Sequence, residues 1–182
     1  MRLTLTACLL LLLLPNLPAH ALYDPAPDPS LAAVQGAWVG TLQYQDYQQP
    51  GRMVSLPTRL YVAAAGPNAL TLYYVFDDGP GKTVHSYERM DFDFVANKLA
   101  WTSGADAPQR CSLLEAGPAS ASRSLVFECV DAERPDARPT ARHTLTLSSE
   151  ALTLQKEELR DDGSTLLRNR YAFKRAGAAM QD

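Results

Sequence analysis

The chain has 182 residues, and its 20 acidic side chains slightly outnumber its 17 lysines and arginines. This length predicts about one domain, large enough to bury a substantial core. Because there is no basic excess to neutralise phosphates, the composition argues against a nucleic-acid partner.

The first 21 residues have the composition of a secretory signal peptide. Arg2 is their only charged residue, an apolar run follows over Leu3–Leu14, and the segment closes on Ala19-His20-Ala21. A charged start, a short apolar stretch and an A-x-A site are the parts of such a signal. The run is too short for an uncleaved membrane helix, which needs about 20 residues. We therefore expect cleavage near Ala21, a periplasmic or secreted chain, and no transmembrane span in the mature protein; lipid attachment at Cys8 is the alternative.

The rest of the chain predicts a single all-β domain. Residues 22–35 are expected to form a proline-rich tether ending in a short helical turn, and residues 176–182 a flexible tail. Between them, turn-forming residues separate runs rich in Val, Leu, Thr, Tyr and Phe, a pattern typical of successive hairpins. We predict an antiparallel up-and-down meander of eight to ten strands over residues 36–175, as a lipocalin-like barrel or a curled sheet. The runs are Ala37–Tyr47, Arg52–Ala64, Ala69–Asp77, Thr83–Phe94, Lys98–Thr102, Arg110–Leu114, Arg123–Asp131, His143–Leu147, Leu152–Arg160 and Thr165–Lys174.

Two cysteines, Cys111 and Cys129, remain once the signal is removed. Both lie about nine residues from the middle of a turn near 117–122, so a symmetric hairpin places them opposite each other. An even pair in an exported chain favours a disulfide, which would stabilise the fold by about 3 kcal/mol. Two cysteines supply only half of a tetrahedral zinc site, so we expect no metal role for them.

The triplet Gly36-Ala37-Trp38 opens the first long strand, directly after the expected helical turn. It resembles the G-x-W motif at the start of the first strand in lipocalins and related calycin barrels. This resemblance implies that Trp38 closes one end of a barrel and that an arginine of the last strand, Arg168 or Arg170, packs across its ring. Such stacking has a physical motive, because a guanidinium over an indole gains about 0.5–2 kcal/mol. A second lipocalin motif and the C-terminal helix of that family are not visible in the sequence.

No catalytic or cofactor signature stands out, and we expect neither a cofactor nor enzymatic activity. A nucleophile elbow and a phosphate-binding glycine loop are not found. His85 could form a metal site with Asp91 and Asp93 if the fold gathers them, although a solvated polar face explains the same alternation. His143 stands alone in its run. An enzyme would require one of these histidines to converge with carboxylates in a cleft.

Aromatic residues crowd the first four predicted strands and suggest a ligand-binding interior. If Trp38 points inward, the alternation of side chains along a strand also directs residues of the first and third predicted strands into the interior of the barrel. Small barrels either fill with such side chains or hold one small ligand. We therefore expect an exported, non-enzymatic barrel that binds a small apolar or amphipathic molecule. The alternative is an envelope-accessory module with a packed core and a protein partner at its outer face. The candidate interior residues are Leu42, Tyr44, Leu72, Tyr74 and Phe76.

Overall fold

The computed structural model describes residues 27–46, 48–49, 51–130, 136 and 138–177. The expected signal peptide at 1–21, residues 22–26 of the expected tether and residues 178–182 of the expected tail lie outside the described residues. The described part holds one short helix and ten strands. Their bounds are α1 Pro29–Ala33, β1 Gly36–Gln45, β2 Met53–Gly66, β3 Ala69–Asp77, β4 Thr83–Asp93, β5 Lys98–Ser103, β6 Gln109–Ala116, β7 Arg123–Val130, β8 Ala141–Leu147, β9 Ala151–Leu159 and β10 Thr165–Arg175.

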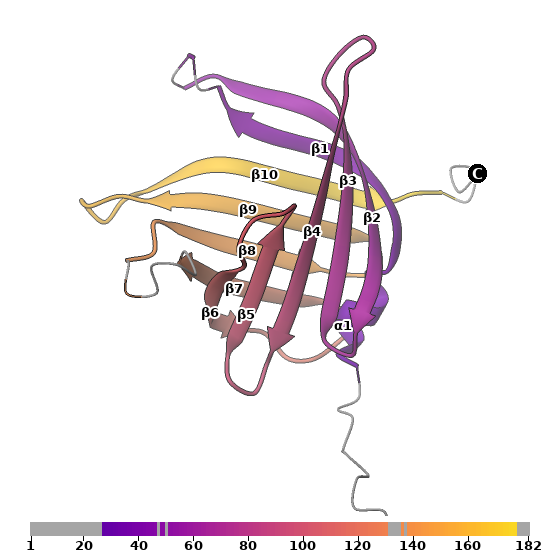
Figure 1. The fold of residues 1–182 in the computed structure, drawn as a ribbon, viewed down its shortest axis with the longest axis vertical. Helices are drawn as coiled ribbons and strands as arrows, with labels where there is room; N and C mark the ends of the chain where they lie inside the picture. The colour runs from indigo at the N-terminus through magenta and orange to yellow at the C-terminus, as the bar shows by residue number, and fades with distance from the viewer. Residues whose placement is uncertain (1–26, 47, 50, 131–135, 137, 178–182) are drawn as a thin grey trace, which may run out of the picture.

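The strands close into an antiparallel barrel (Figure 1). Each strand pairs with its neighbours along the chain, and β1 completes the ring by pairing with β10. This confirms the predicted all-β meander and decides for a closed barrel over an open curled sheet. Closure leaves no sheet edge unpaired along the body of the barrel, which removes the usual risk of edge-to-edge association.

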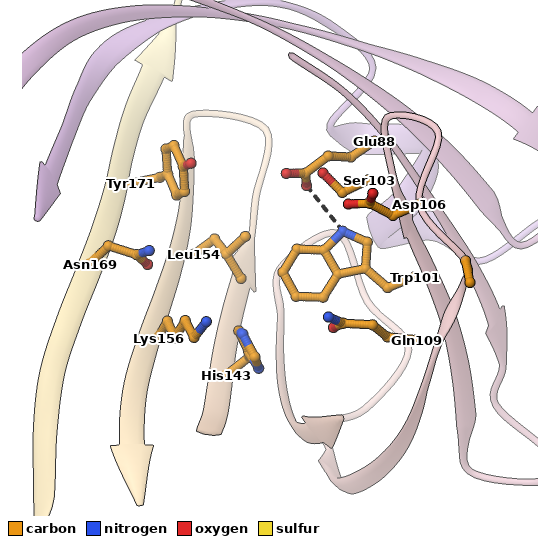
Figure 2. Close-up of a pocket in the computed structure, with 11 residues that line it drawn as sticks. Glu88, Trp101, Ser103, Asp106, Gln109, His143, Leu154, Lys156, Asn169 and Tyr171 are labelled. Carbon is orange, nitrogen blue, oxygen red and sulfur yellow. Dashed lines mark hydrogen bonds between the residues drawn. The ribbon is translucent and has the colours of Figure 1, made fainter. Parts of the chain in front are cut away.

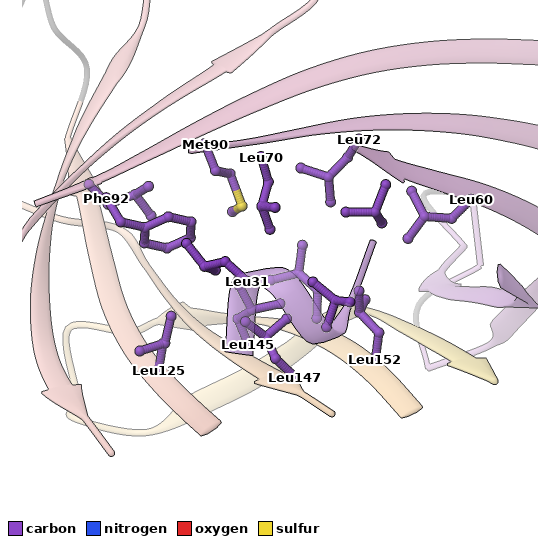
Figure 3. Close-up of a cluster of buried hydrophobic side chains, with 14 of the residues drawn as sticks. Leu31, Leu60, Leu70, Leu72, Met90, Phe92, Leu125, Leu145, Leu147 and Leu152 are labelled. Atoms are coloured by element: carbon purple, nitrogen blue, oxygen red, sulfur yellow. The ribbon is translucent and has the colours of Figure 1, made fainter. Parts of the chain in front are cut away.

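One end of the barrel, the closed end, is covered by α1. Asp28 caps this helix by accepting a hydrogen bond from the backbone N–H of Ser30 at 2.9 Å. The same carboxylate forms a buried ion pair with Arg123 of β7, whose guanidinium lies 4.0 Å above the ring of Phe94. Leu31 enters the core among leucines of β8 and β9 (Figure 3). These contacts fix the short helix against the strands, because five helical residues have little stability of their own.

Trp38 is buried at the closed end, and its indole N–H donates to the carbonyl of Val34 at 2.8 Å. The guanidinium above its ring, at 4.1 Å, belongs to Arg175. The expectation of Arg168 or Arg170 at this place was therefore wrong. In the antiparallel pairing of β1 with β10, Trp38 near the start of β1 meets Arg175 at the end of β10. Arg168 lies seven residues away, which is about 23 Å along a strand.

The predicted pairing of the two cysteines is present. Cys111 on β6 and Cys129 on β7 face each other in the register of that hairpin and form a disulfide. Such a bond fits an oxidising compartment. Among the described residues, no helix is long and apolar enough to cross a membrane.

The end opposite α1, the mouth, is more open. Strand β3 pairs with β2 only up to Thr58 and Phe76, so residues 53–57 of β2 pair with β1 alone. Strand β4 likewise pairs with β5 only from Glu88 onward. The β1–β2 and β3–β4 hairpins therefore extend separately beyond the rest of the barrel, as Figure 1 shows.

Candidate functional site

A cavity of about 180 Å³ opens at the mouth and is lined by side chains of two facing walls (Figure 2). We call it the mouth pocket. Its apolar surface comes mainly from Trp101, Leu154 and Tyr171, and most of its other residues are polar or charged. The lining residues are Glu88, Trp101, Ser103, Asp106, Ala107, Gln109, His143, Leu154, Lys156, Asn169 and Tyr171.

The first wall consists of β4, β5 and β6. Register places Glu88 of β4 opposite Ser103 of β5, and Trp101 of β5 opposite Gln109 of β6. Alternation along β4 puts Glu88 on the same face as Met90, which is fully buried deeper in the barrel. The indole N–H of Trp101 donates to Oε2 of Glu88 at 3.1 Å. This hydrogen bond fixes the position of the Glu88 carboxylate against β5.

The second wall consists of β8, β9 and β10. Cross-strand pairing aligns His143, Lys156 and Asn169 in one row across these strands. One step deeper, Leu154 of β9 pairs with Tyr171 of β10. A register shift between Leu167 and Asn169 marks a bulge directly beside this row. Bulges often reorient side chains next to binding sites, and here Asn169 comes to lie opposite Lys156.

Glu88 is the acidic group most affected by this setting. Burial raises its pKa to about 7, and the hydrogen bond from Trp101 only partly offsets that effect. A carboxyl group with such a pKa changes between its neutral and charged forms near neutral pH. Glu88 can therefore act either as a hydrogen-bond donor or as an anion toward a bound molecule.

His143 is 4% exposed and is held between rings. Its imidazole stacks on Phe127 with ring centroids 5.1 Å apart, and meets Trp101 edge-on at 5.0 Å. Burial and the nearby charge of Lys156 lower its pKa to about 4, so the ring is neutral at pH 7. Its Nδ1 is buried and has no hydrogen-bond partner in the described structure. A buried polar atom without a partner costs free energy, so this imidazole is held in place at the expense of some stability.

The five interior residues predicted from sequence lie beside the mouth pocket and are not among its lining residues. Leu72, Tyr74 and Phe76 are buried, Leu42 packs partly buried against the core, and Tyr44 is half-buried. The ring of Tyr74 stacks on Phe76 at 5.8 Å and contacts Tyr171 at 5.1 Å.

Tyr171 therefore separates this aromatic cluster from the mouth pocket, and burial raises the pKa of both Tyr74 and Tyr171. Phe76 also lines a second hollow, between the β1–β2 and β3–β4 hairpins.

The residues considered for a metal site lie apart on the outer surface. His85 accepts or donates a hydrogen bond with the hydroxyl of Tyr73 at 2.7 Å, and Asp91 pairs with Arg89. Asp93 accepts from backbone N–H groups of the following turn. In the part of the chain that the structure describes, no three His, Cys, Asp or Glu side chains gather in a group that could hold a metal ion.

The last-strand arginines expected over Trp38 lie elsewhere. Arg168 contacts Gln45 and Glu158, and Arg170 is exposed on the outer face. The sequence reasoning missed Glu88 and Lys156 as site residues, and it left His143 without a partner. A signal was present, because each continues a face of apolar residues along its strand toward the mouth.

Comparison with known proteins finds likeness in fold and none in sequence. No protein-family model matches the chain, and no curated protein matches it. The crystal structure of Rv2717c from M. tuberculosis matches with a TM-score of 0.57 at 12% identity, over 83% of this chain and 99% of that chain. The structure of the S-type phycobiliprotein lyase CPES from Guillardia theta matches with a TM-score of 0.49 at 7% identity, over 81% and 91%. What this chain shares with the first of these structures is its fold, a closed antiparallel barrel.

The expectation that this chain is not an enzyme is corrected by the site itself. The structure brings His143 into one pocket with the carboxylate of Glu88, which is the convergence that an enzyme would require and that the sequence alone left open. At 12% identity and below, the likeness extends to the fold and not to any activity.

Proposed function

We propose that this barrel binds one small amphipathic molecule in the mouth pocket, with a ring or short apolar body against Trp101, Leu154 and Tyr171. The observation that carries the proposal is the cavity itself, about 180 Å³ in volume, in which polar and charged side chains from two facing walls converge beside these apolar groups. A pocket with an apolar surface and a few convergent polar groups is the usual form of a ligand site.

The volume of the mouth pocket limits the size of the ligand. An engineered cavity of about 150 Å³ holds one benzene molecule. The mouth pocket, at about 180 Å³, is slightly larger and open on one side, so substituents of a ring can reach toward solvent. The ligand we propose is therefore a single substituted ring or an aliphatic molecule of similar size.

The proposal places this activity outside the cytoplasm. It is supported by the signal-like composition of residues 1–21 and by the disulfide between Cys111 and Cys129. Disulfides persist in secreted and periplasmic proteins and are rare in the reducing cytosol.

The test uses the two tryptophans as separate reporters. Trp101 lies in the mouth pocket, whereas Trp38 is buried at the closed end, so their indole N–H signals in an NMR spectrum report on the two ends of the barrel. Benzyl alcohol, benzoate and benzylamine, added in turn, serve as single-ring probes. We expect at least one probe to shift the Trp101 signal saturably while the Trp38 signal stays in place. If no probe shifts the Trp101 signal saturably, the proposal is overturned.

A matched pair of variants locates the binding. Asn169→Phe places a ring inside the mouth pocket, and Gln155→Phe places the same ring on the outer face of the adjacent strand. We expect Asn169→Phe to abolish the probe-dependent shift and Gln155→Phe to retain it. Equal binding by both variants would show that the probe binds elsewhere.

A second candidate function is a protein-interaction module, and one surface feature favours it. Tyr61, Tyr73 and Tyr87 are cross-strand neighbours on the outer face of β2, β3 and β4, and each is more than 40% exposed. Large exposed apolar groups in contact often mark an interaction surface. Cross-linking in the native environment tests this function: a partner lost in Tyr73→Ser and retained in Asn169→Phe supports it, and the reverse pattern excludes it.

A further inference from the structure

The two walls of the mouth pocket carry opposite charge. Glu88 of β4 and Asp106 of the β5–β6 turn lie on one side, and Lys156 belongs to the wall of β8–β10. Figure 2 shows the two carboxylates on one side of the cavity and the side chains of Lys156 and Asn169 on the other. Because the mouth pocket lies between them, a molecule inside it meets an acidic group on one side and a basic group on the other.

Neither Glu88 nor Lys156 is neutralised by an ion pair within the described residues. The hydrogen-bond partner of Glu88 is the neutral indole of Trp101. Arg142, the neighbour of His143 on β8, is by contrast paired with Glu128. A partly buried charge without a counter-charge is unfavourable, and a ligand that supplies the counter-charge recovers that free energy.

His143 does not add a second positive charge to the wall of β8–β10 at neutral pH. Its neutral ring leaves Lys156 as the one cation among the described residues that line the mouth pocket. The row of His143, Lys156 and Asn169 then combines one positive charge with neutral hydrogen-bonding groups. Such a row suits a carboxylate, which accepts several hydrogen bonds at once.

We propose that the ligand of the mouth pocket is amphoteric: a compact molecule with an amine directed to Glu88 and a carboxylate directed to Lys156, and with an apolar body against Trp101 and Tyr171. This inference rests on the proposed function and names the class of its ligand.

The experiment measures binding of four probes at pH 8, where the carboxyl of Glu88 is ionised. The probes are 4-(aminomethyl)benzoate, which carries both charges, benzoate and benzylamine, which carry one each, and benzyl alcohol, which carries none. Dissociation constants come from the shift of the Trp101 indole signal, and the Trp38 signal reports an intact fold. We expect 4-(aminomethyl)benzoate to bind about tenfold more tightly than either singly charged probe.

Two variants assign each end of the ligand. Lys156→Met is expected to weaken 4-(aminomethyl)benzoate and benzoate about tenfold and to leave benzylamine unweakened. Glu88→Gln is expected to weaken 4-(aminomethyl)benzoate and benzylamine by a similar factor and to leave benzoate unweakened. Lys174→Met, which removes an exposed lysine of β10, is the matched control and should change none of the four constants.

The pH dependence gives an independent readout. Since the pKa of Glu88 is about 7, the affinity for benzylamine should rise as the pH increases from 6 to 8, and Glu88→Gln should lose this rise. If benzyl alcohol binds as tightly as 4-(aminomethyl)benzoate, or the variants weaken all charged probes alike, the amphoteric ligand is refuted while the proposed function stands. If none of the four probes shifts the Trp101 signal, both are refuted.

Discussion

At the scale of single residues, Glu88 couples the stability of the barrel to pH. Its pKa is raised from 4.5 to about 7 in the folded chain, so the folded state binds this proton more tightly than the unfolded state. The free energy of unfolding therefore falls as the pH rises from about 4.5 to about 7. Above that window the loss is complete, and it amounts to about 3 kcal/mol.

Glu88→Gln removes this titration and keeps an oxygen that can accept the indole hydrogen bond of Trp101. We expect the variant to gain stability over the natural chain as the pH increases from 5 to 8, by up to about 3 kcal/mol, measured by urea unfolding at each pH. His143 titrates in both proteins, so the difference isolates Glu88. Glu115→Gln, which removes an exposed carboxylate of β6, controls for the change in net charge. A constant difference between variant and natural chain across this range would contradict the assignment.

Arg175 is the second residue with a measurable role. Its guanidinium covers the indole of Trp38 and donates to the carbonyls of Ala33, Gln35 and Ser149, so it joins α1 and the β8–β9 turn to the closed end. We expect Arg175→Gln to lower the free energy of unfolding by about 2 kcal/mol, through loss of the cation–π contact and of hydrogen bonds.

The exposed Arg170 on the same strand is the control. Arg170→Gln should change stability by about 0.5 kcal/mol or less, as is usual for exposed surface positions. Urea unfolding followed by tryptophan fluorescence measures both variants. Equal losses in the two would show that Arg175 has no special role at the closed end.

At the scale of the strands, Gly40 of β1 allows the barrel to close. A Cβ at this position would lie 1.9 Å from the carbonyl oxygen of Ala172 on β10, which is backbone and cannot move aside cheaply. We expect Gly40→Ala to destabilise the chain by about 3 kcal/mol or more, measured by thermal unfolding. Gly66→Ala is the matched control, because its Cβ would meet only the Cβ of Ala69 at 3.6 Å, an ordinary contact. If Gly40→Ala unfolds at the same temperature as Gly66→Ala, the close approach of β1 and β10 is not required.

Strand periodicity explains how much of this fold could be predicted. Each of the ten runs identified by composition overlaps one strand, although the ends often differ by one or two residues, and the position of the cysteines about a turn predicted their hairpin. Alternation also defines which side chains share a face of a strand. It does not say which strands face each other across a barrel, since that depends on the stagger with which the sheet closes.

This limit explains why the predicted interior and the mouth pocket differ. The sequence reasoning followed aromatic residues on the first and third strands, and these pack together next to Tyr171. Glu88 continues the apolar face of Met90, and Lys156 continues that of Leu154. An ionisable residue that extends an apolar face toward the end of a strand is the signal that would have identified both.

The arginine over Trp38 was missed for a related reason. The last strand was predicted to stop at Lys174, one residue before Arg175. A closed antiparallel barrel requires the end of β10 to meet the start of β1, so the final residue of the last strand is the natural partner of Trp38. Closure is a property of the whole sheet, and it could not be derived from the local pattern of one strand.

At the scale of the whole molecule, the two ends of the barrel differ in packing and in charge. The closed end combines α1, Trp38 and the buried ion pair of Asp28 with Arg123 into a well-packed base. The mouth carries partly buried charges on opposite walls around a cavity. This division suits a binding protein, because the base supplies stability and the mouth can tolerate unpaired polar groups that serve a ligand.

The central claim is that the mouth pocket holds one small molecule, and native mass spectrometry tests it most directly. The natural chain and Asn169→Phe are each incubated with the filtered small-molecule fraction of the cells that produce the protein. The account predicts a single additional mass at one molecule per chain on the natural protein, released on denaturation and absent from Asn169→Phe. The same mass on both proteins, or no additional mass on the natural chain, would contradict it.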